Sequence, residues 1–282
     1  MNKTLEEKAL RIEDLRLIDD VLFETVAQQE GVLEEVLQTI LEDKKLIVTK
    51  VVTQANSSNL YGRGVRLDAL CTLGDGSLCN IEVQRANNDN HLKRVRFNAS
   101  SITVRESTSG MHFGDVVELY VIYISEFDFL GGGKTIYHIE PTIQETGVVV
   151  NDGLHKIFVN TKIKDGSLIS KLMTCFLQKE IKDSNFPKLS KAMHSIKHTQ
   201  GGVRAMAGVI RYYEEIAMEK GRKEGVAEGR KEGSKFTSLE SAKILYHDGV
   251  AESSIVKTIA AAYDVSIPEA TEIFNTQVRE NT

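Results

Sequence analysis

The sequence has no tryptophan, only three prolines and only three cysteines among its 282 residues. So few prolines exclude a proline-rich linker protein, and 6% aromatic residues argue against a site built from an aromatic cage. The cysteines, Cys71, Cys79 and Cys175, are too few for a disulfide framework and form no CxxC pair, which favours a reducing compartment. No apolar run reaches the 18 residues of a membrane span, and the first 20 residues are too charged for a signal peptide. We therefore expect a cytoplasmic protein with no membrane partner.

The overall charge balance is slightly acidic. Apolar residues make up 41% of the chain and charged residues 27%, which is enough apolar content for a folded core. The formal net charge of −5 excludes a globally basic protein that coats nucleic acid. It leaves room for a local basic groove, because electrostatic attraction depends on where the charges lie.

The order of expected elements indicates an α/β protein. Hydrophobic periodicity predicts helices at 5–28, 32–41, 91–107 and 167–181, and strands at 46–54, 65–72, 78–84, 116–125, 135–140 and 155–163. The run at 116–125 is nearly continuously apolar, which is typical of a strand buried on both faces. We expect a nuclease-sized core over residues 1–200, a charged segment over 201–238 and a small helical module over 239–282.

The charged segment contains a short internal repeat. Residues 219–235 carry six basic and four acidic side chains, with glycine at 221, 225, 229 and 233. In a helix these glycines would form a stripe that permits close approach of another helix, which favours a homo-oligomer, such as a dimer, formed through the C-terminal region. A mobile charged linker remains the alternative. Beyond the repeat we expect three short helices over 239–247, 252–262 and 268–274, which we interpret as a packing module because the last of them is acidic.

The most informative stretch runs from Arg66 to Gln84 and turns at Gly74-Asp75-Gly76. A three-residue loop closed by Gly76 in the left-handed region makes the numbers of opposed residues sum to 150. Asp68 then lies opposite Glu82, with Cβ atoms roughly 4.5–5.5 Å apart. The apolar residues Val65, Leu67, Ala69, Cys71, Cys79, Ile81 and Val83 share one face, and Arg66, Asp68, Asn80, Glu82 and Gln84 share the other. A two-residue turn would separate Asp68 from Glu82, so we predict the odd-length loop.

Two directly opposed carboxylates repel each other unless a proton, a basic side chain or a metal lies between them. Oxygen ligands on rigid strands favour Mg²⁺, which keeps several waters, and a metal-bound water near a phosphate forms a hydrolytic centre. Gln84 projects from the same face as Glu82 and could position the attacking water or contact the phosphate. The alternative is an ordinary strand with a polar solvent-facing side.

The wider pattern resembles the PD-(D/E)XK superfamily and, more narrowly, the recombination-promoting nuclease (Rpn) or transposase family. The residues that carry the resemblance are Asp20-Val-Leu-Phe23, Arg66-Leu-Asp68, the Gly-Asp-Gly turn, Ile81-Glu82-Val83-Gln84 and Arg94. It covers about residues 15–235, because the glycine repeat is also similar to the C-terminal part of that family. The expected fold is therefore a mixed central sheet flanked by helices, with a helical C-terminal extension.

The resemblance implies a Mg²⁺-dependent DNA endonuclease, with Mn²⁺ able to substitute. Asp68, Glu82 and the Val83 carbonyl would be metal ligands, and Asp20 on the first helix would complete the site. Gln84 occupies the position that is usually lysine in the superfamily, so positive charge must come from a metal or from a nearby basic residue. Glu24 departs from the family pattern, in which a basic residue is more usual at that position.

A basic segment follows the predicted site. Residues 85–105 contain Arg85, Lys93, Arg94, Arg96 and Arg105 against one acidic residue, a net charge of +4. We expect Arg94, Arg85, Lys93 and Arg96 to contact DNA phosphates, although a solvated basic helix face would look the same in the sequence. The alternative function, from another class, is a catalytically inactive DNA-binding or oligomeric scaffold.

Overall fold

The structure is a computed structural model that describes residues 12–57, 65–87 and 90–280. Its internal contacts divide the chain into two compact units, residues 1–211 and 212–282. The first unit is a mixed α/β fold and the C-terminal region is helical, which confirms the predicted fold class. None of the helices in the described ranges combines the length and apolar character that crossing a bilayer requires.

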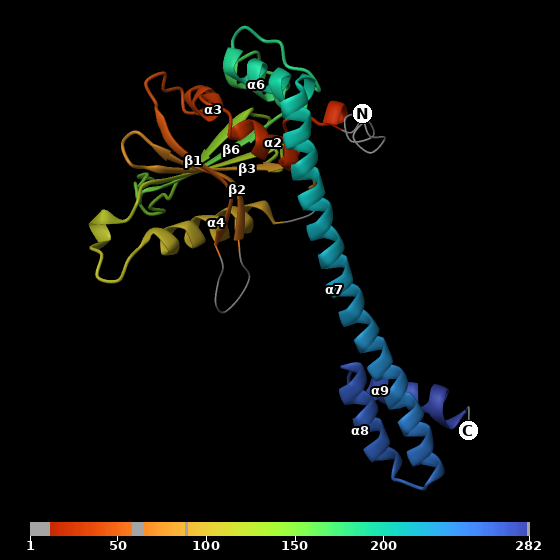
Figure 1. Ribbon diagram of the computed structural model, residues 1–282. Helices are drawn as coiled ribbons and strands as arrows, with labels where there is room; N and C mark the ends of the chain where they lie inside the picture. Colours follow the sequence, from red (N-terminus) through yellow and green to blue (C-terminus); the bar gives the residue numbers. More distant parts are fainter. Residues whose placement is uncertain (1–11, 58–64, 88–89, 281–282) are drawn as a thin grey trace. The chain divides into compact units, whose positions relative to one another are not determined.

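A six-stranded mixed sheet forms the centre of the first unit, with strand order β1-β2-β3-β4-β6-β5 (Figure 1). The strands are β1 (Val48–Ser57), β2 (Val65–Leu73), β3 (Leu78–Gln84), β4 (Leu119–Ser125), β5 (Ile136–Ile139) and β6 (Leu154–Asn160). Strands β3, β4 and β6 are parallel to one another, whereas β1, β2 and β5 pair antiparallel with their neighbours. The parallel strand β4 is buried almost throughout, as its continuous apolar run predicts.

Helices cover both faces of this sheet (Figure 1). They are α2 (Asp20–Ala27), α3 (Val32–Ile40), α4 (His91–Glu106), α5 (Leu168–Leu177) and α6 (Pro187–His198), with a short 3₁₀ turn, η1 (Phe113–Asp115). Helices α2, α3, α5 and α6 share the larger apolar core with Ala69, Cys71, Cys79, Ile81 and Val83 of the sheet. Helix α4 packs on the other face in a second core.

The β2–β3 hairpin has the predicted register. The paired residues are Ala69–Ile81, Leu70–Asn80, Cys71–Cys79 and Thr72–Leu78, so their numbers sum to 150. The turn is closed by a 3.1 Å hydrogen bond from the Gly76 amide to the Leu73 carbonyl, and Gly76 has φ +90°, which favours glycine. The three-residue loop is confirmed, and it places Asp68 and Glu82 at the next positions beyond Ala69 and Ile81.

Three local expectations were wrong. Leu67 packs in the core beside α4 and not with Ala69, although both residues pair in register with β1. The helix expected over 5–28 is interrupted by turns after residue 14, and α2 begins only at Asp20; the residues before Ile12 lie outside the described ranges. The helix expected over 239–247 is not separate, since it is the end of α7 (Gln200–His247).

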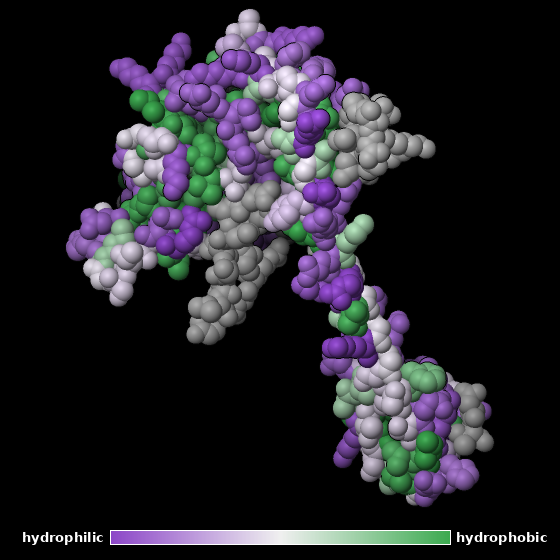
Figure 2. Space-filling view, in the orientation of Figure 1, coloured by the Kyte–Doolittle hydropathy of each residue, from purple (hydrophilic) through white to green (hydrophobic). Residues whose placement is uncertain are grey.

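The second unit contains the rest of α7, which begins in the first unit, followed by α8 (Glu252–Tyr263), α9 (Ile267–Ile273) and the π-helical turn η2 (Phe274–Arg279). Ala242, Ile255, Ile259 and Phe274 are among the residues of its small apolar core. The glycine repeat lies within α7, and a Cβ added at any of its four glycines would meet no atom within 4 Å. The visible side chains along this helix are mostly hydrophilic (Figure 2).

Candidate active site

Asp68 and Glu82 come together beyond the paired part of the β2–β3 hairpin. The Val83 amide donates a 2.9 Å hydrogen bond to Oδ2 of Asp68, so a side chain takes the place of a main-chain partner at this point. The Asp68 side chain is 9% exposed and Glu82 is fully buried. The N–H and C=O of one strand residue point to the same side, so the Val83 carbonyl also faces β2. The structure therefore brings together the three predicted metal ligands.

The two carboxyl groups have raised pKa values. Burial is the largest cause for Asp68, whose pKa lies well above its usual 3.8, and the neighbouring Glu82 and Asp20 raise it further. Burial also raises the pKa of Glu82 above its usual 4.5, although hydrogen bonds from Asn80 and the charge of Arg94 oppose this effect. A buried pair of like charges binds protons or a cation more readily than either group would alone.

Helix α4 places Arg94 over this pair. The helix starts at His91 after Asn90, whose side chain accepts a 3.0 Å hydrogen bond from the Lys93 amide and so caps the helix. One turn later, Arg94 donates to Oε1 of Gln84 at 2.9 Å and lies 3.4 Å from Oε2 of Glu82. Gln84 in turn donates to the Ala86 carbonyl at 3.0 Å. Arg94 thus places a positive charge beside Gln84 and Glu82.

Asn80 is a site neighbour to which the sequence assigned no role. It is fully buried on β3, and its Nδ2 donates a 3.1 Å hydrogen bond to Oε1 of Glu82. Its own Oδ1 is buried without a hydrogen-bond partner in the structure, which is unusual for a buried polar atom. The sequence already indicated that Asn80 lies next to Glu82, because residues two apart on a strand share a face.

Asp20 is the first residue of α2 and the exposed member of the acidic group. Its Oδ1 accepts a 2.9 Å hydrogen bond from the Val21 amide, and it lies close enough to Asp68 to raise the pKa of that residue. Glu24, one turn further along α2, is only 2% exposed. The residue that departs from the family pattern therefore faces the interior, while Asp20 faces the solvent.

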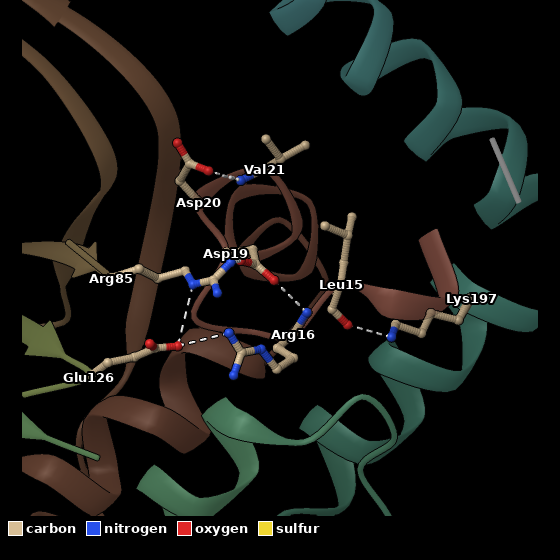
Figure 3. Close-up of polar contacts among 8 residues, drawn as sticks. All are labelled: Leu15, Arg16, Asp19, Asp20, Val21, Arg85, Glu126 and Lys197. Atoms are coloured by element: carbon tan, nitrogen blue, oxygen red, sulfur yellow. Dashed lines mark hydrogen bonds and ion pairs between the residues drawn. The ribbon is translucent and has the colours of Figure 1, made fainter. Parts of the chain in front are cut away.

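Arg85 contacts Asp19 and Glu126 rather than the Asp68–Glu82 pair, and Figure 3 shows these contacts. Its guanidinium forms ion pairs with Asp19 and with Glu126, the latter at 3.3 Å, and Arg16 contacts the same Glu126 oxygen at 2.9 Å. These partners come from the turn before α2 and from the end of β4, so no local sequence pattern links them to Arg85.

Lys93 and Arg96 lie on the exposed side of α4. A helix turns by about 100° per residue, so both point away from the face that carries Arg94. Four residues were predicted to contact phosphates, and Arg94 is the one that the structure places beside the acidic pair. Lys93 and Arg96 lie on the helix surface.

The residues present fit a magnesium ion. In the described part of the chain, no three histidine, cysteine, aspartate or glutamate side chains form a group that could hold a metal ion. Mg²⁺ is commonly bound through one or two carboxylates and keeps several waters, so it does not require such a group. Asp68, Glu82 and the Val83 carbonyl are hard oxygen donors, and a divalent cation would offset the burial that raises both pKa values and the repulsion that raises the pKa of Asp68 further.

Comparison with known proteins identifies a family. The model of a family described as PD-(D/E)XK nuclease family transposase matches residues 2–173, which is more than half of the chain. No curated protein and no solved structure matches the chain.

Proposed function

The chain belongs to the PD-(D/E)XK nuclease family transposases, and on that basis we propose that it is a Mg²⁺-dependent endonuclease that hydrolyses phosphodiester bonds in DNA, with a role in recombination or transposition. The observation that carries the proposal is the meeting of Asp68 and Glu82, buried beside Arg94 at the end of the hairpin. Mn²⁺ is expected to substitute for Mg²⁺, because both accept oxygen ligands.

In the proposed site, Asp68, Glu82 and the Val83 carbonyl hold the metal ion. When bound, the ion supplies Lewis-acid stabilisation and lowers the pKa of a water molecule. Asp20 is exposed at the start of α2 and lies close enough to Asp68 to raise its pKa, so it would complete the acidic group. Gln84 orients the attacking water or a phosphate oxygen by hydrogen bonding, and its Oε1 is fixed by Arg94.

Arg94 stabilises the charge that develops on the phosphate, and Lys93 and Arg96 contact phosphates further along the duplex. Arg94 is a third exposed, so its guanidinium is reachable from solvent even though it touches the buried Glu82. Contacts of this kind set position and affinity, without reading the base sequence.

The test is nicking of a supercoiled plasmid in Mg²⁺. Wild type should cut, and Asp68→Ala or addition of EDTA should abolish cutting. Asp75→Ala is the matched control, because Asp75 is an exposed aspartate in the turn of the same hairpin. Equal cutting by wild type and Asp68→Ala would refute the assignment of the site.

A second candidate is a catalytically inactive DNA-binding or oligomeric scaffold. The observation that favours it is the complete burial of Glu82 beneath Arg94, which is also the arrangement expected of a purely structural ion cluster. This candidate predicts that DNA is bound equally with and without Mg²⁺ and that no metal promotes cutting.

We also propose that the chain forms a homo-oligomer, such as a dimer, through its C-terminal helices. The support is the open stripe of Gly221, Gly225, Gly229 and Gly233 on α7, which would let another helix approach closely. Light scattering on the full chain and on a chain ending at residue 218 tests this. An unchanged number of subunits after truncation would eliminate this role for the region.

A further inference from the structure

We propose that Arg85 is a positioning residue. Together with Asp19, Glu126 and Arg16 it forms an ionic latch, a name we use for these four side chains. The latch fixes the start of α2 and so places Asp20 beside Asp68. The inference replaces the phosphate contact expected for Arg85 from the sequence, and its catalytic consequence rests on the proposed nuclease function.

Arg85 lies on the face of the sheet that α2 covers. The β3–β4 pairing ends at Gln84–Ser125, and the Glu126 amide continues the ladder with a 3.1 Å hydrogen bond to the Gln84 carbonyl. Arg85 and Glu126, the next residues of the two chain segments, therefore lie side by side. Because side chains alternate along a strand, Arg85 points to the face opposite Gln84, which is the face that α2 covers.

The charges within the latch balance one another. Arg85 pairs through Nη1 with Asp19 and through Nε with Glu126, and Arg16 pairs with the same Glu126 oxygen (Figure 3). Two guanidinium groups thus meet two carboxylates, and the side chains of Asp19 and Glu126 are 11% and 25% exposed. A phosphate that drew Arg85 out of the latch would leave the largely buried Asp19 without its cation, whereas Glu126 would keep Arg16.

Asp19 directly precedes α2. Aspartate at this position usually caps the helix by accepting a hydrogen bond from a backbone amide of the first turn. Here the Asp19 side chain makes no such bond to α2. Its Oδ2 instead accepts the Arg16 amide at 2.7 Å, and its Oδ1 contacts Arg85. The carboxylate therefore ties the start of α2 to the end of β3.

The latch determines the position of the next residue, Asp20. Asp20 is turned away from Arg85 and Glu126 in Figure 3, and among the described residues its side chain has one hydrogen bond, from the Val21 amide. Its place near Asp68 is therefore set by the backbone that the latch holds. Since misplacement of a reacting group by about 1 Å can cost ~10²-fold in rate, loosening the latch should slow cleavage without removing a phosphate contact.

Replacing Arg85 by lysine and by glutamine separates the two roles. Lysine keeps the charge and still binds phosphate as a point charge, but its single ammonium cannot bridge two carboxylates as the guanidinium does. A positioning role predicts that Arg85→Lys and Arg85→Gln both lower kcat, by ~10-fold or more, and that Glu126→Gln does the same. It also predicts that the Kd for DNA, measured in EDTA, and its dependence on salt stay at wild-type values.

Arg96 provides the matched control, because it is an exposed arginine on α4 and makes no ion pair within the described residues. As a phosphate contact, Arg96→Gln should reduce the salt dependence by about one ion, and Arg96→Lys should restore it. If the Arg85 variants follow this pattern, with loss in glutamine and rescue in lysine, the latch is overturned.

Hydrogen exchange of the full chain, without metal or DNA, measures how firmly the latch holds the start of α2 and does not depend on catalysis. Arg85→Lys and Arg85→Gln should speed exchange of the amides at the start of α2, and Arg96→Gln should leave them unchanged. Unchanged exchange in the Arg85 variants would overturn the proposal even if the protein is a nuclease. If wild type cuts no DNA but the exchange result holds, the latch stands and the proposed nuclease function fails.

Discussion

The amide of Val83 donates a hydrogen bond to the carboxylate of Asp68 at the point where the main-chain pairing of β2 and β3 ends. The bond holds one buried carboxylate against the backbone next to the other, Glu82. It also lowers the pKa of Asp68, but burial and the neighbouring negative charges outweigh it. The hairpin therefore holds a charge arrangement that is unfavourable for folding and suited to binding a cation.

Asp68→Asn should stabilise the metal-free protein at neutral pH while abolishing cleavage. Asparagine has nearly the same shape and its Oδ1 can still accept the Val83 amide, so the substitution removes only the buried ionisable group. We expect a gain of about 0.5–2 kcal/mol, the size typical of relieving a site that trades stability for function. Urea unfolding in EDTA measures the gain, and a loss of stability would contradict this account.

The gain should depend on pH in a defined direction. Asp68 has a pKa above its usual 3.8 in the folded protein, so the folded state keeps a proton that the unfolded state releases. The metal-free wild type therefore loses stability as pH rises from about 4 through the folded-state pKa, whereas Asp68→Asn escapes this contribution. The difference in Tm between the two proteins should grow with pH over that window, and a difference independent of pH would contradict the assignment.

Arg94→Gln should reduce both stability and cleavage. The substitution removes the cation beside buried Glu82, but the contact is 3.4 Å long and Arg94 is a third exposed. We therefore expect a loss of about 1 kcal/mol, below the value for a fully buried pair. Cleavage should fall by ~10²-fold, as when one stabilising donor is lost. Arg96→Gln is the control and should change stability by less than about 0.5 kcal/mol.

The sequence predicted those parts of the molecule that depend on local patterns. Alternation of apolar residues around Gly76 was enough to set the hairpin register, and with it the meeting of Asp68 and Glu82. The pairing of Arg85 with Asp19 and Glu126 could not be predicted, because it depends on where segments distant in sequence pack.

The charged repeat was ambiguous for a different reason. Glycine costs about 1 kcal/mol relative to alanine in a helix interior, so four of them favour a linker by local propensity. The structure instead contains one helix from Gln200 to His247, with a 2.8 Å ion pair between Glu219 and Lys223 at helical spacing. Pairs of this kind contribute only a few tenths of a kcal/mol each, which a sequence pattern cannot weigh reliably against glycine.

Lys197→Met should destabilise the first unit strongly. The Lys197 side chain is 3% exposed, and its Nζ donates to the carbonyls of Glu13, Leu15 and Lys179 at 3.0, 2.6 and 2.6 Å. Methionine would keep the packing but leave these carbonyls without their donor, at a cost of about 3 kcal/mol. Lys191→Met is the control, since Lys191 is exposed on the same helix, and equal denaturation midpoints for the two variants would contradict the prediction.

Asn80→Ala should weaken metal binding more than it weakens the fold. Asn80 orients Glu82 through its Nδ2, and loss of a residue that positions a ligand typically costs 10–100-fold in metal affinity. Its unpartnered Oδ1 is a buried polar atom whose removal offsets part of the lost hydrogen bond, so the change in stability should be small. Mn²⁺ affinity, followed by electron paramagnetic resonance, and urea unfolding in EDTA measure the two effects separately.

Asn160→Ala is the matched control for this separation. Asn160 is a buried asparagine at the end of β6, and both ends of its amide are hydrogen-bonded, to the Lys134 carbonyl at 2.7 Å and from the Ile163 amide at 3.1 Å. Its loss should reduce stability by about 1–3 kcal/mol and leave Mn²⁺ affinity unchanged. If Asn80→Ala keeps wild-type Mn²⁺ affinity while Asp68→Asn loses it, the metal site stands and the positioning of Glu82 by Asn80 does not.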